Sequence, residues 1–296
     1  MDKHRRVKMT ERDGAELKKY WERYPDTKDH LTMTVDTVVI CPSFDERRDA
    51  TYQQNDEFSF RILLVKRGRW PEEGKWALPG GFVRKNETCA DAASRELKEE
   101  AGLGLRIQMP IGLFDEPGRD IRGWIASQSY VKIMQPQEGE SVKGGSDADE
   151  AKWFRVVSPI AKNGKMILSF YDEDELVFSV VAHYEEGQFG TSRVTNVEEN
   201  ALAFAHGKII ASALLKLLAC DPLKLVPYFL PARFTLPQFM EVYQYLTMKA
   251  IPETEKPNFR RGLTQKKNPL LVATGEKEKL PDGIGHPPAM LYRLNV

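Results

Sequence analysis

The chain has 296 residues, with 43 basic and 43 acidic side chains, so its formal net charge at pH 7 is zero. Hydrophobic residues make up 41% and charged residues 29%, proportions typical of a soluble globular protein with one large or two modest domains. No apolar run approaches the roughly eighteen residues needed to span a bilayer, and the charged N-terminus lacks the apolar core of a signal peptide. The three cysteines lie far apart without metal-ligand spacing, so we expect reduced thiols, a cytoplasmic protein and no membrane partner.

The first predicted elements are a helix and two strands. Residues 1–29 are expected to form an N-terminal extension with a short polar helix that ends at Pro25. Apolar and polar residues alternate in Leu31–Cys41, and apolar residues fill Phe60–Lys66, which predicts strands on either side of a charged loop. Lys75–Leu78 then leads into a pair of glycines.

From Gly81 to Leu103 the sequence fits the spacing G-x5-E-x7-R-E-U-x-E-E-x-G-U, in which U is apolar, at every fixed position. Thr88 and Asp91 resemble a capping box that opens a helix, and Gly102 can end that helix in the left-handed conformation. A buried stripe with a period of four residues is expected at Ala93, Leu97 and Ala101. Three acids at i, i+3 and i+4 share a different face of the same helix: Glu96, Glu99 and Glu100.

These three acids allow two interpretations. One is an ordinary solvated helix face, since charge runs of this kind are common. However, Glu96 and Glu100 are like charges one turn apart, which costs roughly 0.2–0.5 kcal/mol unless a cation lies between them. Carboxylate oxygens are hard ligands of the kind that Mg²⁺ or Mn²⁺ prefers. The spacing therefore predicts a metal site that could bind a pyrophosphate group.

The pattern is the signature of the Nudix family, which the chain resembles and whose members cleave nucleoside diphosphates linked to another group. The resemblance implies a Nudix α/β/α sandwich and a Mg²⁺ (or Mn²⁺) cofactor. It also implies that Glu99 and Glu100 are the principal metal ligands, with Glu96 close by. In the family, the arginine and glutamate corresponding to Arg95 and Glu87 pair to hold the loop and the helix in register.

Other residues are candidates for substrate binding. Gly80 and Gly81 permit backbone angles that other residues resist. Arg119 and Arg122 could clamp a phosphate or a ribose by forked hydrogen bonds, although a surface salt bridge explains each equally well. The family resemblance implies that the substrate is ADP-ribose or a related nucleoside diphosphate derivative.

The family's general base varies between members. Glu150 is a candidate here, and the alternative is an acid in a solvated turn before the next strand. Trp70 or Trp124 could stack on a nucleobase, although either could instead belong to the core.

After the acidic helix, alternation predicts strands at 105–109, 124–134 and 152–157, which would complete a Nudix domain of residues 30–200. Within it, residues of about 160–200 exceed what a Nudix domain requires. Apolar and polar residues alternate there at Lys165–Phe170 and Leu176–Tyr184, which predicts a hairpin, and its expected role is limited to covering the domain or forming a dimer contact. A connecting helix is expected at 201–221, ended by Asp221 and Pro222.

Residues 222–296 predict a separate domain with the element order of a winged helix-turn-helix. Thr235–Gln238 forms a capping box before one helix, and Asn258 can cap a second helix that exposes Arg260 and Arg261. Two strands around a loop follow. Such a module places its second helix in the major groove of duplex DNA. Eleven Lys and Arg against six Asp and Glu give this part a balance of +5, which suits an anionic partner, although an accessory domain without DNA remains the alternative.

Three segments of this domain resemble the tail of the Nudix-related transcriptional regulators of NAD metabolism (NrtR type): Phe234–Phe239, Asn258–Arg261 and Gly285–Leu294. Three others resemble the Nudix half of that group: Lys75–Val83, Arg119–Gly123 and Leu202–His206. The resemblance implies DNA contacts by Asn258, Arg260, Arg261 and His286, with His286 in place of the arginine usual in the wing.

Two hypotheses follow, and they are compatible. The first is a Mg²⁺-dependent pyrophosphohydrolase, which the complete set of acids favours, and the second is a DNA-binding regulator that senses ADP-ribose, which the tail favours. A winged helix-turn-helix usually needs two copies on a palindromic site, so we also expect a homodimer.

Overall fold

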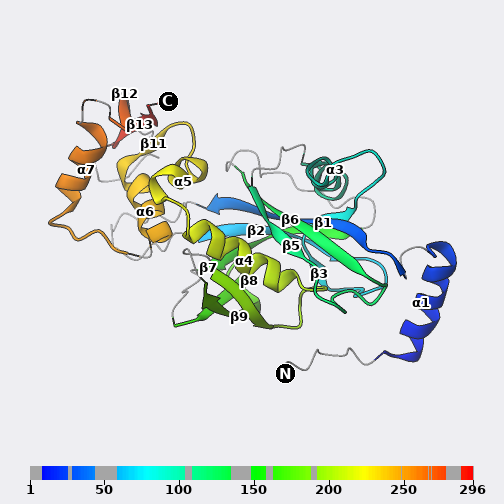
Figure 1. The fold of residues 1–296 in the computed structure, drawn as a ribbon. Coiled ribbons are helices and arrows are strands. Elements are labelled where there is room, and N and C mark those ends of the chain that lie inside the picture. Colours follow the sequence, from blue (N-terminus) through cyan, green and yellow to red (C-terminus); the bar gives the residue numbers. More distant parts are fainter. Residues whose placement is uncertain are drawn as a thin grey trace.

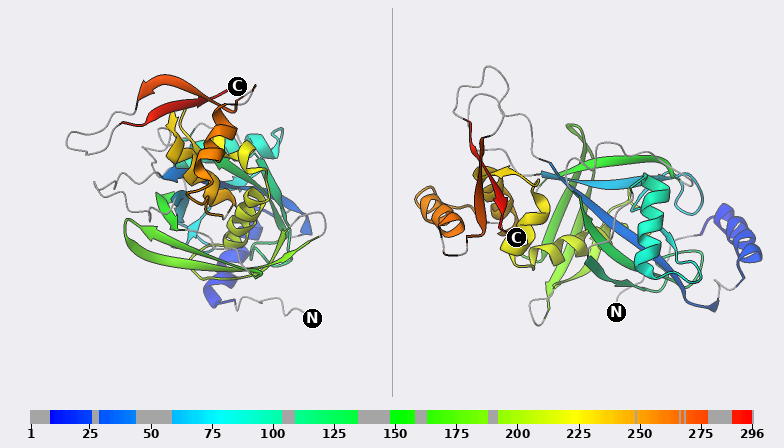
Figure 2. Two further views of the ribbon diagram at one scale, coloured as in Figure 1. Left: turned by 90° about the vertical axis from the view of Figure 1, so that its left-hand side faces the viewer. Right: turned by 90° about the horizontal axis from the view of Figure 1, so that it is seen from above.

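The computed structural model describes residues 9–25, 29–43, 59–103, 109–134, 148–157, 163–187, 192–247, 249–265, 267, 269–277 and 288–295. A large sheet occupies the centre of the molecule, with helix α1 at one end and a small C-terminal domain at the other (Figures 1 and 2). Helix α1 spans Glu11–Arg23 and starts with a capping box between Thr10 and Asp13. The polar helix predicted for the N-terminal extension is therefore present.

The central sheet has ten strands, eight of them in the order β10-β9-β8-β7-β2-β1-β6-β5, with β3 paired to β2 and β4 paired to β1. Strands β1 and β6 run parallel, and β1 and β2 run antiparallel. Most of the expected strands are confirmed, although most of the one expected at 105–109 lies outside the described residues. The strands have these bounds: β1 Thr32–Ser43, β2 Ser59–Arg67, β3 Trp76–Ala77, β4 Gly80–Phe82, β5 Met109–Phe114, β6 Ile125–Ile133, β7 Ala148–Val157, β8 Lys165–Asp172, β9 Glu175–Glu186 and β10 Ser192–Glu198.

The hairpin expected within 160–200 is present as β8 and β9, and β10 adds a further strand beside it. These three strands continue the same sheet through β7. Their inward side chains, among them Phe170 and Val180, are fully buried in the main hydrophobic core. The segment therefore provides part of the surface on which the connecting helix packs.

Alternation along the central strands assigns side chains to two faces. Val38 and Ile40 of β1 belong to the large core that contains helix α4 (His206–Leu218), whereas Val39 between them packs with Leu97 of helix α3 (Cys89–Ala101). The sheet is thus covered by α4 on one face and α3 on the other (Figure 1). This is the predicted α/β/α sandwich, built because every second side chain of a strand points to the same face.

Helix α4 ends at Leu218, before Asp221 and Pro222, as expected from the sequence. A further helix, α5 (Pro222–Phe229), was not predicted; the Asp221 side chain caps it by accepting a hydrogen bond of 3.0 Å from the Leu223 amide. Proline is tolerated at the first helical position because its missing N–H would have no intrahelical partner there. The dipeptide that follows the end of one helix therefore begins the next.

The C-terminal domain has the predicted winged helix-turn-helix order. Helix α6 (Leu236–Thr247) starts with the expected capping box between Thr235 and Gln238, and helix α7 spans Lys256–Thr264. A three-stranded sheet in the order β11-β13-β12 consists of β11 (Phe234–Thr235), β12 (Leu271–Lys277) and β13 (Met290–Leu294). Its core is continuous with that of the sandwich, because Phe229 and Leu246 belong to the same cluster as Ile40.

The prediction that Asn258 caps the second helix is wrong. Helix α7 starts three residues earlier than expected, at Lys256 after Glu255, which makes no side-chain capping bond, and Asn258 is the third residue inside it. Pro257 explains the difference, because a proline in the first turn lacks only an N–H that has no acceptor in the helix. His286 lies outside the described residues.

Candidate functional site

The turn before α3 brings the backbone close to its acids. Strand β4 pairs with β1 so that Gly80 is opposite Asp36 and Gly81 is opposite Val35. A Cβ added at Gly81 would lie 2.5 Å from the Glu96 carboxyl carbon, and one added at Gly80 would collide with the Val35 carbonyl. Glycine is needed at both positions because of this packing, and both residues also line the cavity described below.

Helix α3 is delimited as the sequence predicts. Thr88 and Asp91 form the capping box at its start, and Gly102 ends it with φ of 73°. Ala93, Leu97 and Ala101 are buried. This registration turns the three acids away from the core and towards the Gly81 loop.

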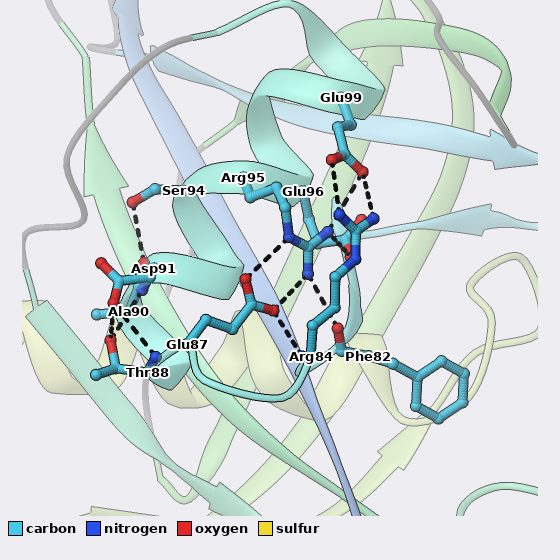
Figure 3. A network of polar contacts seen from close by, with 10 residues as sticks. All are labelled: Phe82, Arg84, Glu87, Thr88, Ala90, Asp91, Ser94, Arg95, Glu96 and Glu99. Carbon is cyan, nitrogen blue, oxygen red and sulfur yellow. Dashed lines mark hydrogen bonds and ion pairs between the residues drawn. The ribbon is translucent and has the colours of Figure 1, made fainter.

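Arg95 connects the loop to the helix (Figure 3). Its Nε and Nη2 donate to the two carboxylate oxygens of Glu87 at 3.0 and 2.7 Å, and Nη2 also donates to the Phe82 carbonyl at 3.0 Å. The hydrogen bonds from Arg95, together with one from the Arg84 amide, lower the pKa of Glu87 to about 2. The expected pairing of Arg95 with Glu87 is therefore present.

The three acids have different partners. Arg95 also donates to Glu96, and the Arg84 guanidinium makes a forked contact with Glu99 at 3.1 and 3.4 Å. Glu100 is more deeply buried, and its Oε2 accepts a hydrogen bond of 3.0 Å from the Gly80 amide. Burial raises the pKa of Glu96, and burial with the nearby charge of Glu96 raises that of Glu100 to about 8. Two adjacent, partly buried carboxyl groups are thus placed where a cation would stabilise their charged forms.

In the described parts of the chain, no three His, Cys, Asp or Glu side chains converge into a ready-made metal cluster. The reason is visible in Figure 3, where arginines hold Glu96 and Glu99. The donor set still fits a magnesium-type ion, because Glu100 offers a desolvated carboxylate whose partner is a single amide, and Glu96 and Glu99 offer further hard oxygens beside it.

A cavity of about 840 Å³ connects the acids with the other predicted residues. Several residues chosen from the sequence line it: Gly80, Gly81, Glu96, Glu99, Glu100, Arg119, Arg122 and Trp70. Trp124 is 55% exposed and does not line it. Glu150, expected in a turn or as a base, instead lies exposed within β7 opposite Lys66 and does not line it either.

The two candidate arginines are already paired. Arg119 faces Asp36 at 3.4 Å, and Arg122 makes a forked contact with Asp120, with distances of 3.0 and 2.7 Å. Both pairs are buried in the cavity wall, so neither is the surface salt bridge considered as the alternative. The Arg122 guanidinium also lies 5.1 Å from the ring of Phe82.

Asp36 and His206 are site residues that the sequence reasoning missed. The Leu78 amide donates to His206 Nδ1 at 2.8 Å, so the ring proton resides on Nε2, which faces Asp36 at 3.3 Å. Burial opposes the charge on Asp36, but His206, Arg119 and the Ser127 hydroxyl outweigh it and lower the Asp36 pKa to about 2. One signal was present in the sequence, namely an aspartate in the middle of a largely apolar strand.

Arg67 was also missed. It ends strand β2 and lines the cavity, where its Nε donates to the Pro71 carbonyl at 2.8 Å and its guanidinium lies 4.8 Å from the Phe204 ring. Among the described residues, no carboxylate lies within 4.0 Å of it. Arg67 is thus a half-buried cation with hydrogen-bond donors left for an anion.

Three of the four candidate DNA-binding residues, Asn258, Arg260 and Arg261, lie on α7, on the far side of the molecule from the acids (Figure 1). Phe259 and Leu263 pack inward, whereas Asn258, Arg260 and Arg261 are exposed. Arg260 also donates to the Tyr292 hydroxyl at 3.3 Å. The predicted orientation of this helix is therefore correct.

Comparison with known proteins assigns both halves of the chain. Residues 47–167 match the NUDIX domain, and residues 226–294 match the NrtR DNA-binding winged helix domain. The chain therefore combines a Nudix domain with a winged helix domain. More specifically, it has the domain composition of an NrtR-type protein.

Two of the individual relatives match different parts of the chain. An ADP-ribose pyrophosphatase of Methanocaldococcus jannaschii is 45% identical over 94 residues, which is 32% of this chain and 54% of that protein. An ADPR responsive transcriptional repressor of Acinetobacter baylyi is 24% identical over 241 residues, or 81% of this chain and 77% of that protein. The chain spans about half the length of the pyrophosphatase and of the diphosphoinositol polyphosphate phosphohydrolases that it also matches.

A solved structure shares the fold along most of the chain. Shewanella oneidensis NrtR in complex with a 27mer DNA superimposes with a TM-score of 0.54 at 23% identity, covering 88% of this chain and 93% of that one. In the described residues, no helix is long and apolar enough to cross a membrane.

Proposed function

We propose that the Nudix domain is a Mg²⁺-dependent pyrophosphohydrolase of ADP-ribose or a closely related nucleoside diphosphate derivative. The observation that carries the proposal is the set of three acids, Glu96, Glu99 and Glu100, on one wall of a nucleotide-sized cavity. Burial raises the pKa of two of them, Glu96 and Glu100. The Methanocaldococcus jannaschii relative, named as an ADP-ribose pyrophosphatase, supports the choice of substrate.

Glu96, Glu99 and Glu100 would hold the ion. When bound, the ion would neutralise charge on the phosphoryl oxygens and lower the pKa of an attacking water. The chain's own groups do the positioning. Arg95 keeps the loop against α3, and the Gly80 amide orients Glu100. Arg67 offers its free donors to a phosphate oxygen, since a guanidinium fork matches phosphate geometry.

Release of AMP from ADP-ribose tests this proposal. Wild-type protein should release AMP when Mg²⁺ is present and not in the presence of a chelator. Glu100→Gln keeps the shape of the side chain but removes its charge, so turnover should fall by a factor of roughly a hundred or more. The matched control is Glu150→Gln, an exposed acid outside the cavity, which should retain the wild-type rate. Full activity of Glu100→Gln would disprove the metal assignment.

A second function is supported by the C-terminal domain. We propose that it binds duplex DNA through α7, with Asn258, Arg260 and Arg261 directed outwards and His286 in the wing. The Shewanella oneidensis relative was solved with DNA, and the Acinetobacter baylyi relative is named as an ADPR responsive repressor. A physical link between the two halves exists as well. Helix α4 starts at His206 in the cavity and contacts α6 of the winged helix domain.

Fluorescence anisotropy with the duplex upstream of the protein's own gene tests the second function. Binding should weaken steeply as salt rises, because phosphate contacts release counterions. Replacing Arg260 and Arg261 with Ala should abolish sequence-selective binding and leave AMP release unchanged. The control is a variant with Lys18 and Lys19 of α1 replaced in the same way. Helix α1 lies at the opposite end of the molecule (Figure 1), so this variant should bind the duplex as wild type does. Absence of selective binding at low salt, with or without ADP-ribose, would leave only the enzyme.

The DNA-binding proposal includes a homodimer, because one winged helix covers a small site. Sedimentation equilibrium at micromolar concentration should give twice the mass of one chain. A mass equal to one chain would contradict this part of the proposal.

A further inference from the structure

Helix α1 lies outside both regions matched by known domains, yet it is attached to the wall of the cavity. Trp21 Nε1 donates to the Arg122 carbonyl at 2.7 Å, and Trp70 Nε1 donates to Asp13 at 3.1 Å. Leu17 is buried beneath the helix. Side chains on one side of α1 thus fix it beside the two loops that carry Trp70 and Arg122.

This attachment places a second set of side chains inside the cavity. Tyr20 and Tyr24 both line it, with ring centroids 5.1 Å apart, and the Tyr20 ring lies 6.4 Å from that of Trp70. The Arg122 guanidinium is 5.8 Å from the Tyr20 ring. Tyr20 lies in α1, Tyr24 directly after its end and Trp70 in the segment after β2. The acids come from α3, so the two groups form different parts of one wall.

The aromatic rings of Tyr20 and Tyr24 are not needed to hold α1 in place, which argues against a purely structural role for them. Leu17, Trp21 and Asp13 already hold the helix, whereas Tyr24 remains 45% exposed. Flat aromatic surface facing a hydrated cavity is unfavourable until it is covered, and a planar base can cover it by stacking. The cavity volume of about 840 Å³ lies in the range of roughly 300–1,000 Å³ usual for small-molecule sites.

We propose that Tyr20, Tyr24 and Trp70 form a stacking wall for the nucleobase of the ligand, so that α1 is part of the binding site and selects ligands that carry a base. This inference rests on the proposed nucleoside diphosphate ligand. It assigns the two ends of that ligand to different elements, with the diphosphate at α3 and Arg67 and the base at α1.

Isothermal titration of the full-length protein, in the presence of a chelator so that no hydrolysis occurs, tests the wall. The probes are ADP-ribose and ribose 5-phosphate, which lacks the base. Tyr20→Leu should raise the Kd for ADP-ribose about tenfold, because one base–ring stack contributes roughly that factor. Its Kd for ribose 5-phosphate should change less than twofold. Tyr20→Phe keeps the ring and should bind both probes as wild type.

Trp124→Leu is the matched control, since Trp124 is exposed outside the cavity, and it should bind both probes as wild type. Equal weakening of both probes by Tyr20→Leu would mean that α1 only supports the cavity, which overturns the inference. Equal affinity of wild-type protein for the two probes would overturn it as well, while AMP release from ADP-ribose would still decide the proposed hydrolase on its own.

Discussion

Asp36 offers a quantitative test of how the cavity is held together. It is 6% exposed and receives the Ser127 hydroxyl at 2.5 Å, His206 at 3.3 Å and Arg119 at 3.4 Å. Its pKa falls from 3.8 to about 2 on folding, even though burial by itself would raise it. A difference of this size corresponds to about 2 kcal/mol of folding stability.

The sign of the pH dependence follows from the lowered pKa. The stabilisation is fully present above pH 3.8 and is lost as the pH falls towards 2, because the unfolded chain takes up the proton first. Asp36→Asn removes the charge at nearly constant volume. At pH 7 the variant should therefore be less stable than wild type by at least about 2 kcal/mol. The gap should shrink by roughly half at pH 3, where only wild type loses this contribution.

Urea unfolding followed by circular dichroism, at several pH values from 7 to 3, measures the gap. The control is Asp172→Asn in the partly exposed pair with Lys152, which should cost less than about 1 kcal/mol at neutral pH. A gap for Asp36→Asn that is as large at pH 3 as at pH 7 would refute the reasoning, because the loss would then come from packing rather than charge.

Three further changes follow from the geometry of the site. Gly81→Ala places a Cβ 2.5 Å from the Glu96 carboxylate, so the Mg²⁺ concentration for half-maximal turnover should rise severalfold; an unchanged Mg²⁺ titration would contradict this. Thr88→Ala removes the cap of α3 and should lower the urea-derived stability by about 1 kcal/mol, and no loss would show that the cap is dispensable. Arg67→Ala should raise KM for ADP-ribose tenfold or more, whereas Arg155→Ala, a change outside the cavity lining, should leave it unchanged. The same KM in Arg67→Ala as in wild type would exclude phosphate binding by Arg67.

Features set by neighbouring residues could be predicted from the sequence. The box spacing, the cap at Thr88 and the left-handed Gly102 are local, since each depends on hydrogen bonds or backbone angles within a few residues. Strand alternation and the hairpin at 165–186 are local in the same sense, because a period of two shows which side chains face inward. The pairing of Arg95 with Glu87 followed from a family pattern with fixed spacing.

Reasoning from neighbouring residues failed where the same residues can either end a helix or start one. Asp221 and Pro222 follow the end of one helix and also start another, α5, which packs against α6. Asn258 is a good capping residue, but the helix gains an extra turn by starting before Pro257. In both cases a proline lies in the first turn of a helix. A proline can end a helix as well as stand in its first turn, so the sequence by itself did not show that a helix starts there.

Only the tertiary structure decided the composition of the cavity. The Leu78 amide and His206 are 128 residues apart, and Asp36 and Arg119 are 83 apart, so no spacing rule links them. The sequence does not distinguish Arg67 from Arg119 and Arg122. In the fold, Asp36 and Asp120 pair with the latter two, and the hydrogen-bond donors of Arg67 are left for a ligand. Helix α1 likewise gives no sign of a site until Trp21 and Trp70 fix it beside the cavity, because long-range contacts determine which surfaces a side chain meets.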